Sequence, residues 1–251
     1  GNWVDSANAI TTDSLGNIYI TGYFTGIVDF DFTSGVDTRE STTDNYGTFT
    51  KDIFVTKINS NGSYAWTYTA GSQGEDMGND IEIDSNNNIY LIGHFSKSIK
   101  FDPNPNGNIY FNRGYEDFFV VKLTNNGQFG WAYSAGGTSY DSAKAITIDL
   151  QNNVYITGSF SNSVAFNPST PSNFSVSNGY MDIFILKLNN LGVYSWHKTI
   201  GGTENDSGNG IAIDSNNNIY YAGIFASSVD FNFNSIETDI KTAVSYSDLF
   251  I

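Results

Sequence analysis

Apolar and polar residues alternate along short segments of this chain, and the segments recur. In residues 143–149, AKAITID, Ile146 and Ile148 fall on one face of an extended strand. Residues 154–160, VYITGSF, follow after a turn rich in Asn and Gln. Alternation with a period of two on both sides of such a turn predicts a β-hairpin, with 143–149 as its first strand.

Two further strands are predicted after this hairpin. Residues 182–188, DIFILKL, are apolar on both faces apart from Lys187, which is typical of a strand covered on both sides. Residues 193–200, VYSWHKTI, follow after a turn with a glycine, where a positive φ is needed. The turn glycines of this kind are Gly62, Gly127 and Gly192.

This four-strand unit of about 65 residues occurs four times, as 1–70, 71–135, 136–200 and 201–251. Three columns mark the copies: Asp5, Asp76, Asp141 and Asp206; Phe30, Phe101, Phe166 and Phe231; and Asp52, Asp117, Asp182 and Asp248. The fourth copy lacks the segment that carries Trp66, Trp131 and Trp196 in the others. Only the interval from the phenylalanine to the second aspartate varies, so every insertion falls in one excursion: 31–51, 102–116, 167–181 and 232–247.

The repeat predicts an all-β fold, a β-propeller whose blades are four-stranded antiparallel sheets. Residues 1–251 are then one propeller segment with four blades, the last incomplete, within a larger propeller. A β-solenoid is the alternative, but the period is too long and too antiparallel for it. We expect the innermost strands, rich in small residues, near 7–13, 78–84, 143–149 and 208–214. The excursions should gather at one end of the blades with the Gly-rich turns that precede the first aspartate of each copy.

A specific resemblance follows from the repeat pattern. The segments Gly201-Gly202, Asp206, Ile213-Asp214, Asn218-Ile219-Tyr220 and Val229-Asp230-Phe231 resemble the bacterial β-propeller repeat family SBBP, as found in Bacteroidetes surface proteins. The resemblance covers the whole chain and implies a secreted or surface-displayed modular protein. We therefore expect a bacterial cell-surface location, and further blades, another domain or a partner chain over the open edges.

Composition narrows the classes of partner. The chain has 26 acidic and 11 basic residues, a formal charge of -15, which disfavours nucleic acid and anionic membranes as partners. Hydrophobic residues make up 39% of the sequence, enough for a real core, but no apolar run is long enough to insert into a membrane. With no cysteine, disulfides and thiolate metal sites are excluded.

One metal-like pattern occurs in the first turn of two copies, at Asp84, Asn86 and Asn88 and again at Asp214, Asn216 and Asn218. Oxygen ligands at alternate positions resemble the first half of a calcium loop, but Phe95 and Phe225 stand where the closing carboxylate should be. We interpret these residues as Asx turns, in which the side chains bond their own backbone. No metal or cofactor is therefore predicted, and calcium at these six residues is the alternative.

The aspartates repeated in every copy favour architecture over catalysis, because one active site needs only one set of groups. We expect Asp76, Asp141, Asp206, Asp52, Asp117 and Asp182 to bond loop backbone or to pair with the recurrent Lys57, Lys122 and Lys187. Residues that break the repeat are the usual place for function: His94, His197, Lys97, Lys100, Arg113, Glu116 and the Arg39-Glu40 stretch.

These departures from the repeat do not assemble a reaction. Two histidines in different strands form neither a zinc site nor a catalytic triad by spacing, and we expect His197 at a solvent-facing edge without a partner. Neither a sialidase-type motif nor a phosphate-binding glycine loop is present. We therefore predict no catalytic residues and no enzyme activity.

The variable excursions are the expected binding surface, because loops that vary on a fixed scaffold are where recognition is placed. The candidate residues are Arg39, Arg113, Tyr115, Tyr180 and Tyr246. The first hypothesis is a non-catalytic adhesion or interaction module of the cell surface that binds a protein or glycan. A glycan-binding lectin is the first alternative, and an enzyme of unknown type is the second.

Overall fold

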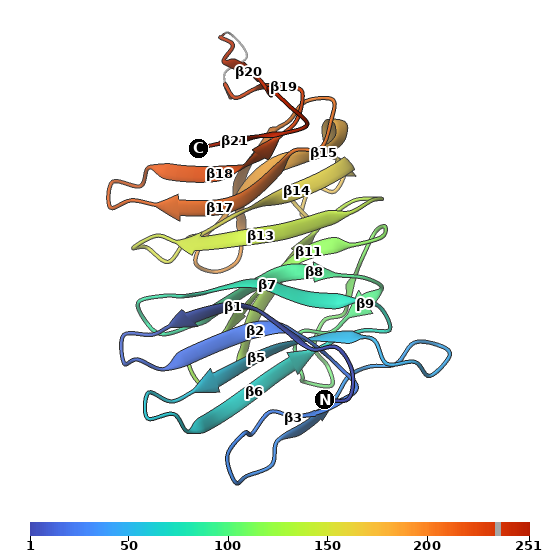
Figure 1. Ribbon diagram of the computed structural model, residues 1–251, viewed down its shortest axis with the longest axis vertical. Helices are drawn as coiled ribbons and strands as arrows, with labels where there is room; N and C mark the ends of the chain where they lie inside the picture. The colour runs from blue at the N-terminus through green and yellow to red at the C-terminus, as the bar shows by residue number, and fades with distance from the viewer. Residues whose placement is uncertain (234–236) are drawn as a thin grey trace. The chain divides into compact units, whose positions relative to one another are not determined.

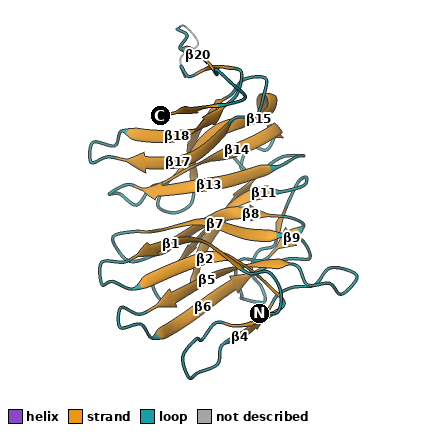
Figure 2. Cartoon of the chain, in the orientation of Figure 1, coloured by secondary structure: helices purple, strands orange, loops and turns teal. Residues whose placement is uncertain are grey.

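The computed structural model describes residues 1–233 and 237–251, and every regular element in this part of the chain is a β-strand (Figure 2). Residues 234–236 of the fourth predicted excursion lie outside the described residues. The strands form four principal sheets in chain order, each within one sequence copy, and three small two-stranded sheets (Figure 1).

Three principal sheets have four strands and the last has three. The first contains β1 (Ser6–Thr12), β2 (Ile18–Thr25), β5 (Lys51–Ile58) and β6 (Tyr64–Ala70). The second contains β7 (Asp76–Ile83), β8 (Ile89–Phe95), β11 (Asp117–Leu123) and β12 (Phe129–Ala135). The third contains β13 (Asp141–Ile148), β14 (Val154–Val164), β15 (Ser175–Leu188) and β16 (Tyr194–Ile200), and the fourth contains β17 (Ser207–Ile213), β18 (Ile219–Phe225) and β21 (Asp248–Phe250).

Within each principal sheet the strands lie side by side in their order along the chain, with the strands of the small sheets left out, and the first and second strands are antiparallel, as in propeller blades. The first strands begin and end within two residues of the predicted ranges. The all-β propeller prediction is therefore confirmed. The glycines in the turns between the third and fourth strands also have positive φ, at 83° for Gly62 and 76° for Gly127 and Gly192.

The chain divides into two compact units with two blades each. Unit 1 comprises residues 1–112 and 119–134, and unit 2 comprises 113–118 and 135–251. In unit 1 a single apolar cluster joins both sheets, with Val55 of β5 against Leu91 of β8 and Val121 of β11. In unit 2 Ile183 and Ile200 of the third sheet pack with Phe225 of the fourth.

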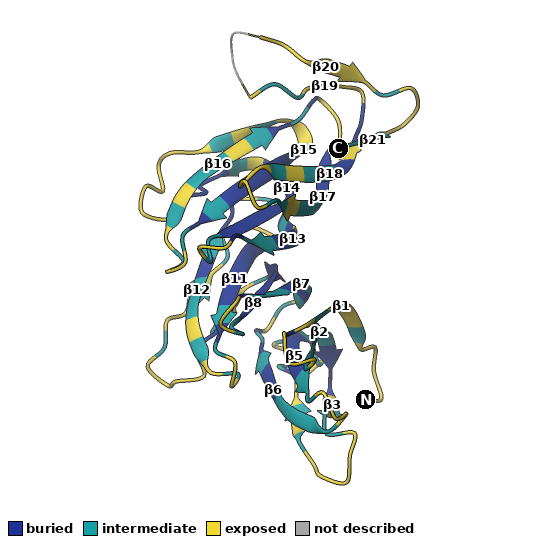
Figure 3. Cartoon of the chain, turned by 90° about the vertical axis from the view of Figure 1, so that its left-hand side faces the viewer, coloured by how far each residue is buried: buried dark blue, intermediate teal, exposed yellow. Residues whose placement is uncertain are grey.

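The strands of a blade differ in how far they are buried, and in three blades the third strand is covered on both sides as the sequence predicts. In the first three blades the third strand is buried along most of its repeated apolar segment, as the pattern on both faces of DIFILKL requires, whereas β21 is half-buried or exposed. β14 is buried from Val154 to Ser161 and β15 over most of Asp182–Leu188, whereas mostly exposed and half-buried residues follow one another along the outer strand β16 (Figure 3). The repeated phenylalanine packs edge-on against the end of the second strand, with ring centroids 5.2 Å apart for Phe24–Phe30 and 5.4 Å for Phe160–Phe166.

The excursions differ from the irregular loops expected from sequence. In three blades they begin as separate hairpins: β3 (Ile27–Asp29) with β4 (Thr38–Glu40), β9 (Ser98–Ile99) with β10 (Tyr110–Phe111), and β19 (Ser228–Asp230) with β20 (Ile240–Thr242). In the third blade β14 and β15 run on past a register shift between Ser161 and Ser163 to form the same hairpin. The phenylalanine column holds each hairpin against its blade, which explains why the insertions lie beyond it.

Candidate binding face

Within each unit the excursions and the Gly-rich turns lie at the same end of the blades. In unit 1 the Thr50 hydroxyl donates to the carbonyl of Ser72, 3.0 Å away. In unit 2 the Asn178 side chain donates to the carbonyl of Gly201, also at 3.0 Å. The predicted grouping of these two sets of loops is therefore confirmed.

Three blades present a tyrosine on the same short loop at this end. The aspartate that begins the third strand accepts a backbone N–H from four residues earlier: Asn178 to Asp182 at 3.0 Å and Val244 to Asp248 at 2.9 Å. Arg113 donates in the same way to Asp117 at 3.2 Å. The tyrosine lies midway in each segment, and we call 113–117, 178–182 and 244–248 the tyrosine loops, although 178–182 is an irregular part of β15 opposite the register shift.

The tyrosines at these positions are exposed although they repeat. Tyr115 is 64% exposed, Tyr180 is 65% exposed and Tyr246 is 99% exposed. Tyr115 also stacks on Tyr140 of the neighbouring turn, with ring centroids 5.0 Å apart and planes 7° apart. Packing of the core therefore does not account for a tyrosine at this position.

The aspartate at the base of the loop is buried instead. Burial raises the pKa of Asp117 and of Asp182 to about 6, against the backbone hydrogen bonds that favour the anion. The carboxylate of Asp182 also fills the space beside Gly201, where an added Cβ would lie 2.1 Å from its Cγ. The Asp182 side chain thus holds both the tyrosine loop and the Gly-rich turn in place.

The aspartates that begin the first strands hold the other side of the junction. Asp141 accepts the N–H of Gly137 at 2.7 Å and that of Ser161 at 3.2 Å. Asp206 accepts the N–H of Gly202 at 2.7 Å and that of Ala226 at 2.9 Å. The prediction that the repeated aspartates bond loop backbone is confirmed.

The proposed pairing of these aspartates with the repeated lysines is wrong. Lys57, Lys122 and Lys187 lie over the rings of Tyr19, Tyr90 and Tyr155, with the ammonium 4.8–5.2 Å from the centroid. Alternation along the third strand explains the difference, because a lysine five residues beyond the aspartate falls on the opposite face of the sheet and at the far end of the blade.

The sequence predicts Arg39 on the binding surface, but its guanidinium is held by other groups of the same blade. Its guanidinium pairs with Asp37, Nε to Oδ1 at 2.8 Å, and donates to the carbonyl of Thr67 at 3.1 Å. The first blade has no tyrosine loop, since Asp52 bonds the N–H of Thr42, ten residues earlier. Arg113 remains exposed beside Tyr115.

Two equivalent grooves lie at the loop end of unit 2. The blade-3 groove has a volume of about 240 Å³ and is lined by Ser139, Tyr140, Ser161, Asn162, Gly179, Tyr180, Met181 and Asn205. The blade-4 groove has a volume of about 470 Å³ and is lined by Glu204, Asn205, Ile224, Ala226, Ser227, Ser245, Tyr246 and Ser247. Each is bordered by the turn before a first strand, the end of a second strand and a tyrosine loop.

Sequence reasoning found the tyrosines of these grooves but missed Tyr140, Asn162 and Asn205. Their columns were readable, since Tyr140 and Asn205 each precede a repeated aspartate. Asn162 and Ser227 share one column and both have a φ of 58°. Lys97 and Gly26 occupy the same column, also with positive φ, so a left-handed residue at this position belongs to every blade.

The Asp/Asn turns at the opposite end have the hydrogen bonds of Asx turns. Asp84 Oδ1 accepts the N–H of Asn86 at 2.9 Å and of Asn88 at 2.8 Å, and Oδ2 accepts the Asn88 amide and the Tyr90 hydroxyl. Asp214 makes the same set with Asn216, Asn218 and Tyr220. Both carboxylates are thus engaged by N–H and O–H donors.

The two histidines lie in different units, and each packs within its blade. His197 was expected at a solvent-facing edge without a partner, and that expectation is wrong. Its ring stacks on Phe166 at 4.4 Å and bonds Ser175 through Nε2 at 2.7 Å and Tyr194 through Nδ1 at 2.8 Å. The phenylalanine column reaches the fourth strand, so the position of His197 is covered.

His94 is buried, with Nδ1 3.3 Å from the Asn79 amide, and burial lowers its pKa to about 4.

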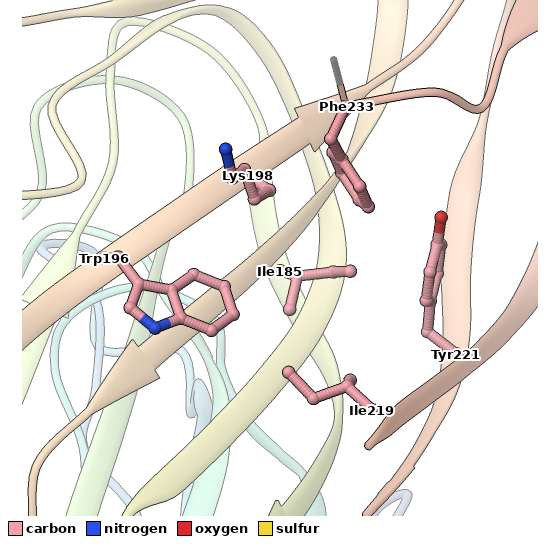
Figure 4. Close-up of a pocket in the computed structure, with 6 residues that line it drawn as sticks. All are labelled: Ile185, Trp196, Lys198, Ile219, Tyr221 and Phe233. Atoms are coloured by element: carbon pink, nitrogen blue, oxygen red, sulfur yellow. The ribbon is translucent and has the colours of Figure 1, made fainter. Parts of the chain in front are cut away.

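An apolar pocket of about 380 Å³ lies between the two sheets of unit 2 (Figure 4). It is lined by Ile185, Trp196, Lys198, Ile219, Tyr221 and Phe233. In unit 1 the counterparts of Ile185 and Ile219, namely Val55 and Ile89, pack with Val121 and Leu123 of β11. The side chains of the pocket thus form an apolar surface shared by β15, β16 and β18.

Two properties of residues 1–233 and 237–251 concern membranes and metal ions. No helix there has the length and apolar character to cross a membrane. No three side chains of the His, Cys, Asp or Glu type gather there as metal ligands.

The chain is similar to a family of propeller repeats and to a viral protein with WD repeats. The family described as SBBP, beta-propeller repeat, matches residues 1–26 and 195–223. An uncharacterized WD repeat-containing protein, L264, from Acanthamoeba polyphaga mimivirus is 27% identical over 191 residues. The match covers 67% of this chain and 14% of the mimivirus protein, so the chain corresponds to a small part of that relative.

Proposed function

Because this chain carries the β-propeller repeat of the SBBP family, we propose that it is a non-catalytic interaction scaffold that binds its partner through the tyrosine loops. The scaffold works as an adhesion module displayed outside the bacterial cell. Propeller repeats supply a rigid frame, and the WD-repeat description of the mimivirus relative supports the same kind of role.

The observation that carries the proposal is a repeated residue that the core does not use. Tyr115, Tyr180 and Tyr246 recur at one position yet stay exposed, on loops held by an aspartate that is buried in two blades and half-buried in the fourth. Tyrosine offers a large amphipathic surface at a low cost in side-chain entropy. A loop already held in place loses little further freedom on binding, so it is suited to recognition.

Adhesion of beads coated with the full chain to intact cell monolayers tests the proposed function. The variant Y115A/Y180A/Y246A should reduce the number of retained beads at least tenfold, as removal of central aromatic contacts does. A matched control, L15A/L150A/L191A, removes exposed side chains from turns at the opposite end of the blades and should retain beads as wild type. Equal retention by the tyrosine variant and wild type contradicts the proposal.

The cell-surface location has a separate test. Protease treatment of intact cells that produce the protein should remove it from the cell fraction, while a cytoplasmic marker stays intact. Protection from the protease until the cells are lysed contradicts surface display and leaves the tyrosine loops to be judged by the bead assay.

A further inference from the structure

The two grooves of unit 2 are copies of one site. Tyr180 and Tyr246 each lie two residues before the aspartate of a third strand, and Asn162 and Ser227 share a φ of 58°. Asn205 lines both grooves, so the two are adjacent. Neighbouring equivalent subsites fit a ligand whose own units repeat.

The groove walls are built before any ligand binds. Asp182 holds the N–H of Asn178, and the Ser177 hydroxyl accepts the N–H of Asn162 at 3.0 Å. Gly179 packs so closely on the next turn that an added Cβ would lie 2.2 Å from the Thr203 carbonyl oxygen. Such a site binds with little loss of conformational freedom.

The lining chemistry selects against charged ligands. Hydroxyls, amides and tyrosine rings dominate, and Glu204 is the one charged side chain among the lining residues. With no lysine or arginine in either groove and a formal chain charge of -15, anions are disfavoured. A neutral ligand with hydroxyl groups and an apolar ring face matches the amide, hydroxyl and aromatic surfaces.

An extended peptide fits less well. Peptides commonly add to a free strand edge, but the strands beside the blade-3 groove already pair with each other, Ser161 with Met181 and Ser163 with Val176. Volumes of about 240 and 470 Å³ lie at or below the lower half of the range for small-molecule sites, roughly 300–1,000 Å³. Each groove therefore suits one or two sugar rings.

We propose that the two grooves are consecutive subsites for a neutral oligosaccharide, with Tyr180 and Tyr246 stacking on successive sugars and Asn205 hydrogen-bonding between them. This inference rests on the proposed function, because it assigns a ligand class to the loops proposed to bind the partner.

Isothermal titration of the full chain with neutral hexasaccharides, namely cello-, xylo-, manno- and maltohexaose, tests the inference. At least one should bind, and more tightly than its own disaccharide by tenfold or more, because it reaches both subsites. Y180A and Y246A should each weaken binding about tenfold. Y46A, which removes a tyrosine 94% exposed in unit 1, is the matched control and should bind as wild type.

The other outcomes are equally decisive. If no hexasaccharide binds at millimolar concentration to chain shown by circular dichroism to be folded, the sugar inference fails. If the bead assay still depends on the tyrosine loops, the scaffold role stands and the ligand is of another class. Sugar binding that Y180A and Y246A leave at the Y46A level places the site elsewhere and also overturns the inference.

Discussion

In the first three blades a buried aspartate of the third strand, Asp52, Asp117 or Asp182, links stability to the binding face. In Asp182 one side chain holds the Asn178 N–H and fills the space beside Gly201. Because both loops depend on this contact, the aspartate, the glycine and the exposed tyrosine form one structural unit. The second and third copies contain all three, as Tyr115, Asp117 and Gly136 and as Tyr180, Asp182 and Gly201.

The glycine beside this aspartate should not tolerate a methyl group. Gly201→Ala should lower the free energy of unfolding by about 3 kcal/mol, since the Cβ overlaps the Asp182 carboxylate. Chemical denaturation measures the change. Gly210→Ala in the same unit meets nothing within 4 Å and should change stability by less than about 1 kcal/mol. In the double variant G201A/D182A the two losses should be less than additive. Strict additivity contradicts the proposed overlap.

The same carboxylates should make the protein more stable at mildly acidic pH. Burial raises the pKa to about 6 in Asp52, Asp117 and Asp182 and to about 7 in Asp141. The folded chain therefore holds these protons more tightly than the unfolded chain, whose Asp pKa is about 3.9. This stability is fully present below that value and is lost as pH rises through 6–7.

The two histidines change the pH dependence of stability in the opposite direction. Burial lowers the pKa of His94 to about 4 and also lowers that of His197, so their contribution is lost as pH falls below about 6.5. The raised carboxylates outnumber them, and we expect greater stability at pH 5 than at pH 8. Denaturation at each pH measures this, and D141N should reduce the slope by up to about 1.4 kcal/mol per pH unit between pH 5 and 7. A stability that increases from pH 5 to pH 8 contradicts this prediction.

At the scale of the strand and turn, the first hairpin of each blade closes through a self-contained carboxylate. Asp149 accepts the N–H of Gln151 and Asn153, the Asn153 amide and the Tyr155 hydroxyl. With four donors on one side chain, the hairpin end needs no cation to neutralise it.

Calcium should therefore leave the stability unchanged. Thermal melts with 5 mM calcium chloride and with chelator should agree within about 2 °C, because a ligand stabilises only in proportion to its binding. D149A, in contrast, should lower the melting temperature by several degrees through the lost hydrogen bonds. A calcium-dependent rise of several degrees that D84A abolishes would show a metal at the turn.

The strands could be predicted from sequence because alternation and the repeated aspartates mark each one. The register shift in every first strand could not, as between Ala143 and Ala145. It leaves the residue between them, Lys144, to bond Ser207 of the next blade at 2.6 Å. The grooves were predicted only in part, since they join turns distant in sequence. His197 was misplaced because its neighbours Phe166 and Ser175 come from the start of the excursion and from within it, far from His197 in sequence.

At the scale of the molecule, each unit has apolar side chains between its two principal sheets. In unit 1 Val121 and Leu123 of β11 are fully buried in the cluster that joins the sheets. In unit 2 β21 pairs with β18 only from Gly223 to Phe225, and the apolar pocket opens beyond that pairing. A strand with apolar residues at alternate positions fits beside β18.

A peptide that supplies such a strand should stabilise unit 2. Residues 120–135 of this chain carry Val121, Leu123 and Phe129, the side chains that pack in the equivalent cluster of unit 1. Added in excess, this peptide should raise the melting temperature by several degrees, because it buries Ile219 and Tyr221 and extends the ladder along β18. The same peptide with Val121→Asp and Leu123→Asp keeps the backbone but loses the apolar side chains, and should give no shift. Equal shifts from the two peptides would mean that backbone pairing or non-specific association, and not the apolar pocket, accounts for binding.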